Sequence, residues 1–272
     1  MILLIKLLPG AFILYLLLLL PRFSRRREVL IFNHRSFAHR GFHSASQLVP
    51  ENSIPAFKEA LKRHLGIELD VHLTRDGKVV VFHDDDLSRM CKTQGTIESM
   101  TYEELRHLHL GNTSEHIPLL TEVLSLVGGR VPLLIELKLP GKDTLLCQKT
   151  QEILDSYQGS YMIQSFNTLV LHWYRTNAPS VLRGQLSSNL MKDKEKNVMF
   201  LRFLSRFLLL NLLGRPDFIS YKYKDRKNPS LFLLQYLYRT PVAVWTLRSV
   251  NDYNDAKKVY NMTIFEKIGE NY

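Results

Sequence analysis

The chain has 272 residues, of which 45% are hydrophobic and 23% charged, a composition typical of a folded globular protein and not of a disordered one. Its formal net charge of +10 favours anionic partners such as nucleic acid, anionic lipid or small phosphate-bearing molecules. No zinc finger, RNP motif or alternation of basic and aromatic residues is present, so we expect no nucleic-acid partner. Cys91 and Cys147 form neither a disulfide framework nor a zinc-ligand spacing.

The N-terminal segment from Ile2 to Leu20 is almost wholly apolar and is followed by Arg22, Arg25, Arg26 and Arg27. About 20 apolar residues can cross a bilayer as a helix. A cleaved signal peptide would carry its charge before the apolar run and small residues at its cleavage site. We therefore expect one uncleaved transmembrane helix within residues 1–28, with an atypical signal peptide as the alternative. The positive-inside rule then places residues 34–272, the main domain, in the cytoplasm.

Beyond this anchor, short apolar runs alternate with amphipathic stretches. Eight runs are predicted as strands: Ser36–His39, Gly66–Val71, Val131–Leu137, Tyr161–Gln164, Val181–Gln185, Asp217–Tyr221, Val242–Trp245 and Thr263–Phe265. The stretches between them are predicted as helices: Ile54–His64, Ile117–Val127, Asp143–Tyr157, Asn167–Asn177, Pro229–Tyr238 and Val250–Tyr260. Strands separated by helices pair in parallel through right-handed crossovers, so the predicted fold is α/β, a (β/α)8 barrel of the TIM type.

Two segments of the sequence are not needed for a minimal (β/α)8 barrel. Val79–His83 predicts a further short strand, and the polar stretch at about residues 84–116 predicts a small insertion. The segment at about residues 191–214 is apolar but carries Arg202 and Arg206, four residues apart and so on one face of a helix. Such a helix either packs on the sheet as a barrel helix or lies on a membrane interface.

Clusters of ionisable residues follow several predicted strands, where barrel enzymes build their active sites. His39 and Arg40 precede Gly41, and Glu51 follows in Pro50-Glu51-Asn52. An imidazole can carry a proton, and a guanidinium presents a planar fork that matches phosphate oxygens. Taken alone, these residues could equally be a loop arginine and a surface histidine.

Two predicted strands each carry a pair of charged residues at positions i and i+2, which point to the same face. Glu68 and Asp70 would repel each other inside a barrel unless a divalent cation lies between them. Glu136 can complete that metal site, and Lys138 can act as a point charge on a phosphate. The alternatives are exposed strand-end acids and a simple ion pair.

His83 closes the apolar run that starts at Val79, and Asp84 follows it. The ordinary pKa of histidine lies near neutrality, which suits a general acid or base. A capped strand end is the alternative. Together the clusters provide a metal site, a proton donor, a proton acceptor and an anion clamp, which suit hydrolysis of a phosphodiester.

The ordered motifs His-Arg-Gly, Pro-Glu-Asn, Glu-x-Asp, His-Asp and Glu-x-Lys resemble the glycerophosphodiester phosphodiesterase family. The similarity is strongest from His39 to Lys138, includes Ile67–Gly77 and Thr101–Leu105, and weakens toward the C-terminus. The resemblance implies a (β/α)8 barrel that hydrolyses glycerophosphodiesters to glycerol 3-phosphate and an alcohol with Mg²⁺ or Ca²⁺.

The resemblance also implies residue roles. They are the acid–base pair His39 and His83; the metal ligands Glu68, Asp70 and Glu136; the phosphate-binding pair Arg40 and Lys138; Glu51, which matches a family position without a firm role; and Trp245, an aromatic beside the glycerol moiety.

The chain departs from the family after Gly41, where a run of small residues is expected, and at Thr263–Lys267, which lacks the usual Asp-x-Pro ending. Two other functions stay open. A lysophospholipase D or sphingomyelinase-D-like enzyme on the same barrel would suit lipid-sized substrates such as lysophospholipids beside a membrane. A catalytically dead phospholipid-binding membrane protein would lack a carboxylate or histidine of the set, and none is missing here.

Overall fold

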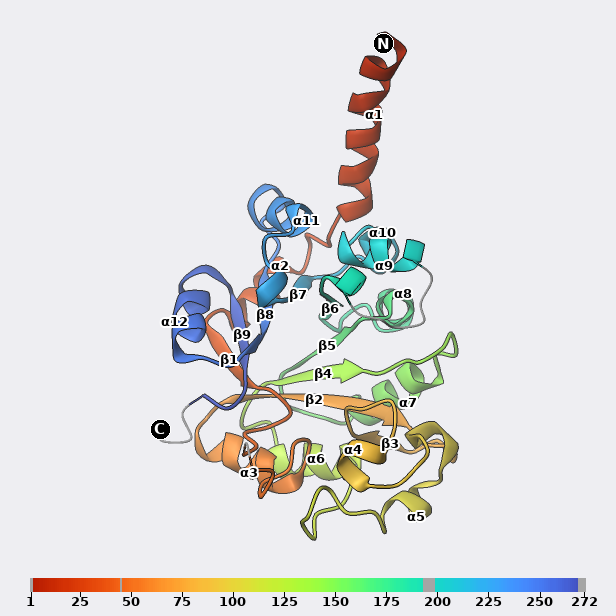
Figure 1. The fold of residues 1–272 in the computed structure, drawn as a ribbon, viewed down its shortest axis with the longest axis vertical. Helices are drawn as coiled ribbons and strands as arrows, with labels where there is room; N and C mark the ends of the chain where they lie inside the picture. Colours follow the sequence, from red (N-terminus) through yellow and green to blue (C-terminus); the bar gives the residue numbers. More distant parts are fainter. Residues whose placement is uncertain (1, 45, 193–198, 269–272) are drawn as a thin grey trace.

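Eight parallel strands close into a barrel in the computed structural model, which describes residues 2–44, 46–192 and 199–268 (Figure 1). The strands are β1 (Arg35–Ala38), β2 (Gly66–Leu73), β4 (Leu133–Leu137), β5 (Tyr161–Ser165), β6 (Arg183–Ser187), β7 (Phe218–Lys222), β8 (Val242–Leu247) and β9 (Met262–Phe265). Closure is direct, because Phe37 of β1 lies opposite Gly66 of β2 and Ile264 of β9. The predicted TIM-type barrel is confirmed.

The six predicted barrel helices are present and begin or end a few residues inside their predicted bounds. They are α3 (Ile54–Lys62), α6 (Leu120–Val127), α7 (Leu145–Leu154), α8 (Thr168–Asn177), α11 (Pro229–Phe232) with the π-helical turn η5 (Leu233–Leu237), and α12 (Val250–Val259). Local sequence explains where they start. The hydroxyl of Ser53 accepts a hydrogen bond from the Ala56 amide at 3.3 Å, and Pro55 occupies the first turn of α3.

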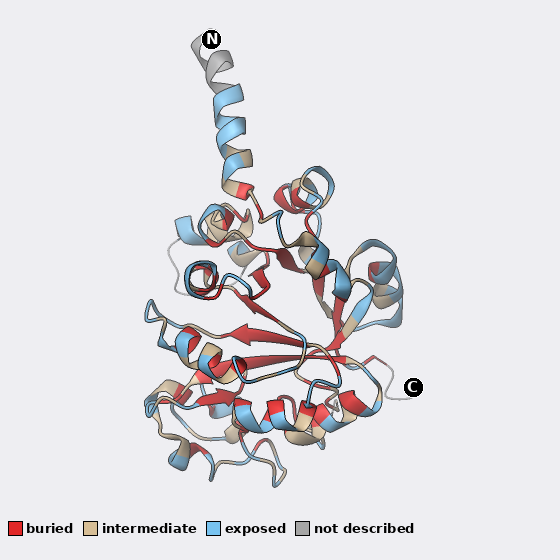
Figure 2. Cartoon of the chain, turned by 180° about the vertical axis from the view of Figure 1, so that it is seen from behind, coloured by how far each residue is buried: buried red, intermediate tan, exposed pale blue. Residues whose placement is uncertain are grey.

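The side chains inside the barrel change from apolar to charged along the barrel axis. Near the amino ends of the strands it is apolar, filled by side chains such as Phe37, Leu134 and Phe218 and covered by Val29 and Phe32. The last two come from α2 (Arg26–Val29) and η1 (Leu30–Phe32). Figure 2 shows the strands largely buried and the coloured part of the N-terminal helix mostly exposed. The apolar end supports the charged residues that follow further along the same strands.

The insertion after β2 forms a small body with its own core. β3 (Val79–Val81) pairs antiparallel with β2 and is followed by α4 (Ser88–Cys91), η2 (Ile97–Ser99) and α5 (Tyr102–Leu105). Its buried core consists of Val80, Phe82, Leu87, Met90, Ile97, Leu105, Leu110 and Ile117. His83 is thus held between a packed strand and a packed insertion.

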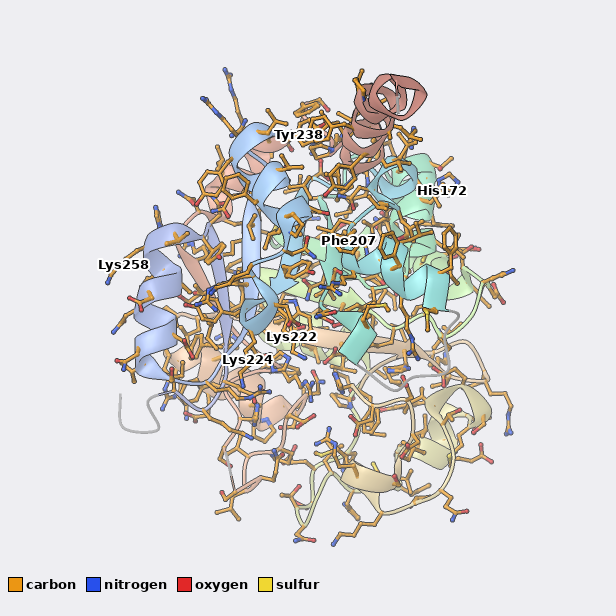
Figure 3. All side chains as sticks on the ribbon, turned by 45° about the horizontal axis from the view of Figure 1, so that its top comes forward. His172, Phe207, Lys222, Lys224, Tyr238 and Lys258 are labelled. Atoms are coloured by element: carbon orange, nitrogen blue, oxygen red, sulfur yellow. The ribbon has the colours of Figure 1, made fainter. Side chains whose placement is uncertain are left out.

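The N-terminal segment is helical, as α1 (Ile2–Leu19), and projects from the barrel (Figure 1). Across the described residues, no helix has the length and apolar character needed to cross a membrane, so the expected transmembrane helix is not found. The last turns of α1 pack against protein instead. Tyr238, at the base of α1 in Figure 3, donates to the Leu16 carbonyl at 2.9 Å, Tyr15 bonds Ser230 at 2.7 Å, and Leu19 is buried.

The apolar segment predicted at about 191–214 is only partly described, since residues 193–198 lie outside the described part. The rest contains η3 (Leu190–Lys192), α9 (Met199–Arg206) and α10 (Asn211–Gly214). No side chain of α9 is buried, and Met199 and Phe200 are exposed. The barrel holds α9 through its last carbonyls, because Ser187 donates to Ser205 at 2.7 Å and Tyr221 to Arg206 at 3.0 Å.

Candidate active site

The carboxyl ends of the strands surround a pocket of about 180 Å³. Seven of the nine residues singled out in the sequence line it: His39, Arg40, Glu68, His83, Glu136, Lys138 and Trp245. The other two touch this set, because Asp70 lies 3.1 Å from the Lys138 ammonium and Glu51 lies 2.6 Å from the Arg40 guanidinium. The residues predicted from five separate motifs, together with Trp245, therefore assemble at one place.

The loop after β1 turns sharply to bring Arg40 over the barrel. Gly41 has a φ of +78°, and a Cβ at this position would lie 2.8 Å from that of Ala56, so no larger residue fits. The Arg40 amide donates to Glu68 at 3.0 Å. The Arg40 guanidinium binds Glu51 at 2.6 Å, which gives Glu51 the role of holding the arginine in place.

Glu68, Asp70 and Glu136 are all buried, and each offers an oxygen within 4.8 Å of the others. Burial, together with the negative charges of Asp70 and Glu136, raises the pKa of Glu68 well above its usual value. Burial also raises the pKa of Glu136, against the charge of Lys138. Three crowded carboxylates are the hard oxygen ligands that Mg²⁺ and Ca²⁺ prefer, so the donor set fits such an ion.

Lys138 balances part of this negative charge. Its ammonium lies 2.6 Å from Glu136 and 3.1 Å from Asp70. Burial lowers the pKa of Lys138, but the two carboxylates outweigh burial and hold that pKa above its usual value. Burial likewise raises the pKa of Asp70, but the charges of Lys138 and Arg40 outweigh it and keep that pKa below its usual value. Lys138 is therefore a fixed positive charge beside the predicted metal ligands.

His39 is buried and lies 2.6 Å through Nδ1 from the Glu266 carboxylate. Burial lowers its pKa to about 4, although the hydrogen bond with Glu266 acts in the opposite direction. The imidazole is therefore neutral near pH 7. With the proton on Nδ1 shared with Glu266, Nε2 is left free to accept a proton. Glu266 was not predicted as a site residue, although it follows β9 directly and the same strand-end argument applies to it.

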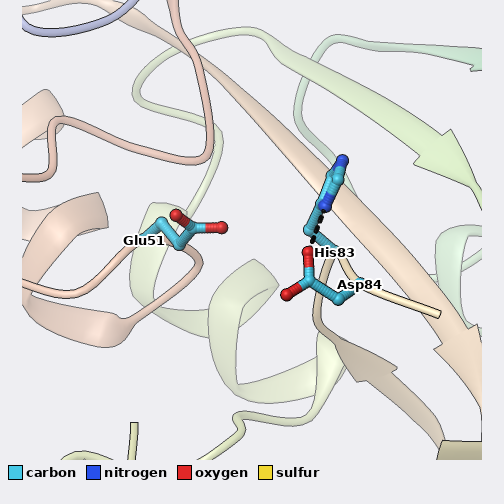
Figure 4. A group of neighbouring side chains, drawn as sticks. All are labelled: Glu51, His83 and Asp84. Carbon is cyan, nitrogen blue, oxygen red and sulfur yellow. Dashed lines mark hydrogen bonds and ion pairs between the residues drawn. The ribbon is translucent and has the colours of Figure 1, made fainter. Parts of the chain in front are cut away.

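His83 is oriented by a second carboxylate, since its Nδ1 lies 2.8 Å from Asp84 (Figure 4). Arg89, also missed, binds Asp84 through Nε at 2.6 Å and Glu51 through a terminal nitrogen at 2.6 Å. Burial raises the pKa of Glu51, but hydrogen bonds from Arg89 and Arg40 outweigh it and lower that pKa to about 2.

The acid groups of Glu51 and Asp84 and the ring of His83 also offer ligand atoms within 4.8 Å of one another. This second group differs from the first, because Arg40 and Arg89 already neutralise its carboxylates. We interpret it as an ion-pair network that orients His83 and Arg40, which leaves the first group as the candidate metal site.

The remaining walls are aromatic and basic. Trp245 meets Phe166 edge to face, with ring centroids 5.7 Å apart. Lys222 and Lys224, which lie near each other in Figure 3, add positive charge to the lining, and Gln164 donates to Glu68 at 3.2 Å. Lys222 is the last residue of β7, so its position at a strand end was the signal that the sequence analysis did not use.

A glycerophosphodiester phosphodiesterase from Caldanaerobacter subterraneus is 37% identical over 162 residues, which cover 55% of this chain and 65% of that protein. The chain thus spans just under two thirds of this relative's length. A putative glycerophosphodiester phosphodiesterase from Bacillus subtilis is 36% identical over 172 residues, which cover 57% of this chain and 70% of that protein.

Solved structures share the fold over nearly the whole barrel. A glycerophosphodiester phosphodiesterase from Thermotoga maritima has a TM-score of 0.64 at 27% identity, over 85% of this chain and 93% of that one. An Oleispira antarctica phosphodiesterase, solved with its product sn-glycerol-3-phosphate, has a TM-score of 0.69 at 22% identity, over 87% of this chain and 94% of that one. The model of the glycerophosphoryl diester phosphodiesterase family matches residues 39–269, and the chain belongs to this family.

Proposed function

We propose that the chain hydrolyses glycerophosphodiesters to glycerol 3-phosphate and an alcohol, with a divalent cation and two histidines. One observation carries the proposal: two histidines, each oriented by its own carboxylate, line one pocket beside three clustered carboxylates and two fixed cations. This arrangement matches the needs of phosphodiester hydrolysis.

Glu68, Asp70 and Glu136 would hold the ion, and their oxygens suit Mg²⁺ or Ca²⁺ better than a softer metal. When bound, such an ion neutralises charge on the phosphate oxygens. It would also offset the burial and the negative charges of Asp70 and Glu136 that together raise the pKa of Glu68.

The protein's own residues then position the substrate. Arg40 and Lys138 bind phosphate oxygens from within the pocket, where ion pairs with Glu51 and Glu136 hold them. Trp245 offers its ring to the glycerol carbons. The side chains of Arg40 and Lys138 are each only 15% exposed, which strengthens these charge interactions.

His39 is the general base in this proposal, because its low pKa keeps Nε2 unprotonated near neutral pH. It removes the proton from the glycerol hydroxyl next to the phosphate, and that oxygen forms a bond to phosphorus. His83, oriented by Asp84, gives a proton to the departing alkoxide as the phosphorus–oxygen bond breaks. Water then opens the resulting cyclic phosphate while the two histidines exchange roles.

We also propose that residues 1–28 hold the domain at the cytoplasmic face of a membrane, since α1 exposes Phe12, Ile13 and Leu14 and arginines follow it. Protease added to intact cells should leave the domain whole. Digestion of the domain from outside would reverse this assignment.

The proposed activity is tested by release of glycerol 3-phosphate from glycerophosphocholine, with and without a chelator. We expect release that chelation abolishes and that Mg²⁺ or Ca²⁺ restores. Undiminished release after exhaustive chelation would refute the metal requirement. Preferential turnover of lysophosphatidylcholine would replace this proposal with the lysophospholipase D alternative.

A further inference from the structure

A second pocket, of about 430 Å³, lies at the opposite end of the barrel from the active site. Its lining includes Arg183, the first residue of β6, and Arg22 and Phe23, which follow α1. The amide of Arg22 donates to the Pro216 carbonyl at 2.9 Å, which ties this segment to the entry of β7. The residues that line the pocket therefore lie at the base of α1 and beside α8 and α10, which are neighbours in the fold (Figure 1).

Four arginines line this pocket: Arg22, Arg175, Arg183 and Arg215. Among the described residues, Asp217 is the one carboxylate that pairs with them, at 3.8 Å from Arg22 and 3.9 Å from Arg183. Both separations are too long for hydrogen bonds. Three positive charges at one small site thus lack a counterion among the described residues.

Among the four pocket arginines, Arg183 gives the strongest indication of a missing anion, because only 2% of this residue is exposed. Its Nε donates to the Gly214 carbonyl at 2.9 Å, but its NH1 is buried and has no hydrogen-bond partner. A buried charged donor without an acceptor is costly. Burial lowers its pKa to about 10, so the group still carries its charge near neutral pH.

A purely structural explanation accounts for only part of this arrangement. Arg22 donates to the Pro179 carbonyl at 2.8 Å, and Arg175 donates to the Leu213 carbonyl at 3.0 Å, so both satisfy backbone acceptors near helix ends. A guanidinium has five donors, however, and these bonds use few of them. Arg215 makes no side-chain hydrogen bond or ion pair with any described residue.

We propose that this pocket is a second anion site, which binds a phosphate group through the guanidinium donors of Arg183 and Arg215. Convergent guanidinium groups match phosphate oxygens in charge and in geometry. The location favours the headgroup of an anionic phospholipid over free phosphate, because the pocket opens beside exposed Phe23 at the base of a helix whose own apolar side chains are exposed. A lipid bound there would place α1 against the membrane.

The test compares Arg215→Gln with Arg27→Gln in the full-length chain. Each variant removes one positive charge near the base of α1. Arg27, however, is exposed and does not line the pocket. In solution, the unfolding midpoint is followed as inorganic phosphate replaces chloride at constant ionic strength. On membranes, binding is measured to phosphatidylcholine vesicles that contain either phosphatidylglycerol or enough oleate to give the same negative charge.

We expect Arg215→Gln to weaken binding to phosphatidylglycerol vesicles about tenfold, the loss of one charge-assisted hydrogen bond, and to leave binding to oleate vesicles at the level of Arg27→Gln. Excess inorganic phosphate should release the wild-type chain from phosphatidylglycerol vesicles more than chloride does. Loss of the phosphate-induced stabilisation in Arg215→Gln, without any vesicle effect, would still support the site and assign it to free phosphate.

The proposal fails if Arg215→Gln and Arg27→Gln behave alike with phosphate in solution and on both kinds of vesicle. The Arg215 side chain makes no hydrogen bond or ion pair with a described residue, and its backbone amide still bonds the Asn211 carbonyl in Arg215→Gln. This variant therefore keeps the test valid even if Arg183→Gln does not fold.

Discussion

The two ends of the barrel handle positive charge in opposite ways. At the carboxyl end, Arg40, Arg89 and Lys138 each lie within 2.6 Å of a carboxylate oxygen. At the amino end, Asp217 is the one described carboxylate that pairs with any of the four pocket arginines, and it lies 3.8 Å from Arg22 and 3.9 Å from Arg183, too far for a hydrogen bond. Tight pairing fixes the direction of each side chain, which catalysis needs. Loose pairing leaves donors free, which suits a ligand that brings its own negative charge.

The largest expected effect comes from the histidines at the carboxyl end. His39→Ala and His83→Ala should each lower kcat about 10²- to 10⁴-fold, because one proton transfer loses its catalyst. Metal binding should persist, since neither residue is a proposed ligand, and calorimetry with Mg²⁺ or Ca²⁺ can check this. The double variant should be little worse than either single one. His34→Ala serves as the control, and a folded His83→Ala enzyme with nearly normal turnover would remove His83 from the mechanism.

Glu68→Gln should lower metal affinity and turnover together, by about a hundredfold, the upper range for residues that support a metal site. The change removes one negative charge from the three-carboxylate group while its size is kept. Turnover measured over a range of metal concentrations separates the two effects. A normal metal affinity with lost turnover would move Glu68 out of the ligand set.

The pKa of His39 predicts how stability depends on pH. This pKa is about 4 in the folded chain, below the ordinary 6.5. The unfolded chain therefore binds the proton first as pH falls, so stability should decline from about pH 6.5 toward 4, by up to about 1.4 kcal/mol per pH unit. Urea unfolding at several pH values measures the slope. His39→Gln should flatten it, and an equal slope in both chains would assign the pH dependence to other groups.

The sequence predicted most of the carboxyl end because alternation along a strand is local. Glu68 and Asp70, or Glu136 and Lys138, must share a face wherever the strand lies. The partners of those residues could not be found in this way. Glu266 meets His39 across 227 positions of sequence, and it does so only because β9 pairs with β1 when the barrel closes.

The arginine pocket was missed for the same physical reason. Its residues run from Arg22 to Arg215, on four different segments, and no periodic pattern connects them. The net charge of +10 indicates that the chain has anionic partners, but it does not show where on the chain they bind. The transmembrane helix expected at the N-terminus was not found among the described residues. Hydropathy alone also does not show that the last turns of this apolar helix bond to Ser230 and Tyr238 of the same chain.

The smallest effects come from a matched pair of arginines, one at each end of the barrel. Arg89→Gln removes the shared partner of Glu51 and Asp84, so both Arg40 and His83 lose part of their support. We expect kcat to fall about tenfold, as for other residues that act through a catalytic neighbour. Because Arg89 touches no substrate in this scheme, the loss should include a changed pH profile of kcat, and Arg89→Lys should recover part of the lost kcat.

Arg215→Gln removes the same charge at the amino end of the barrel and should leave kcat and KM for glycerophosphocholine unchanged. Equal losses in the two variants would mean that net charge, and not the ion-pair network at the mouth, sets the rate; a loss confined to Arg89→Gln would assign catalysis to the tightly paired end alone.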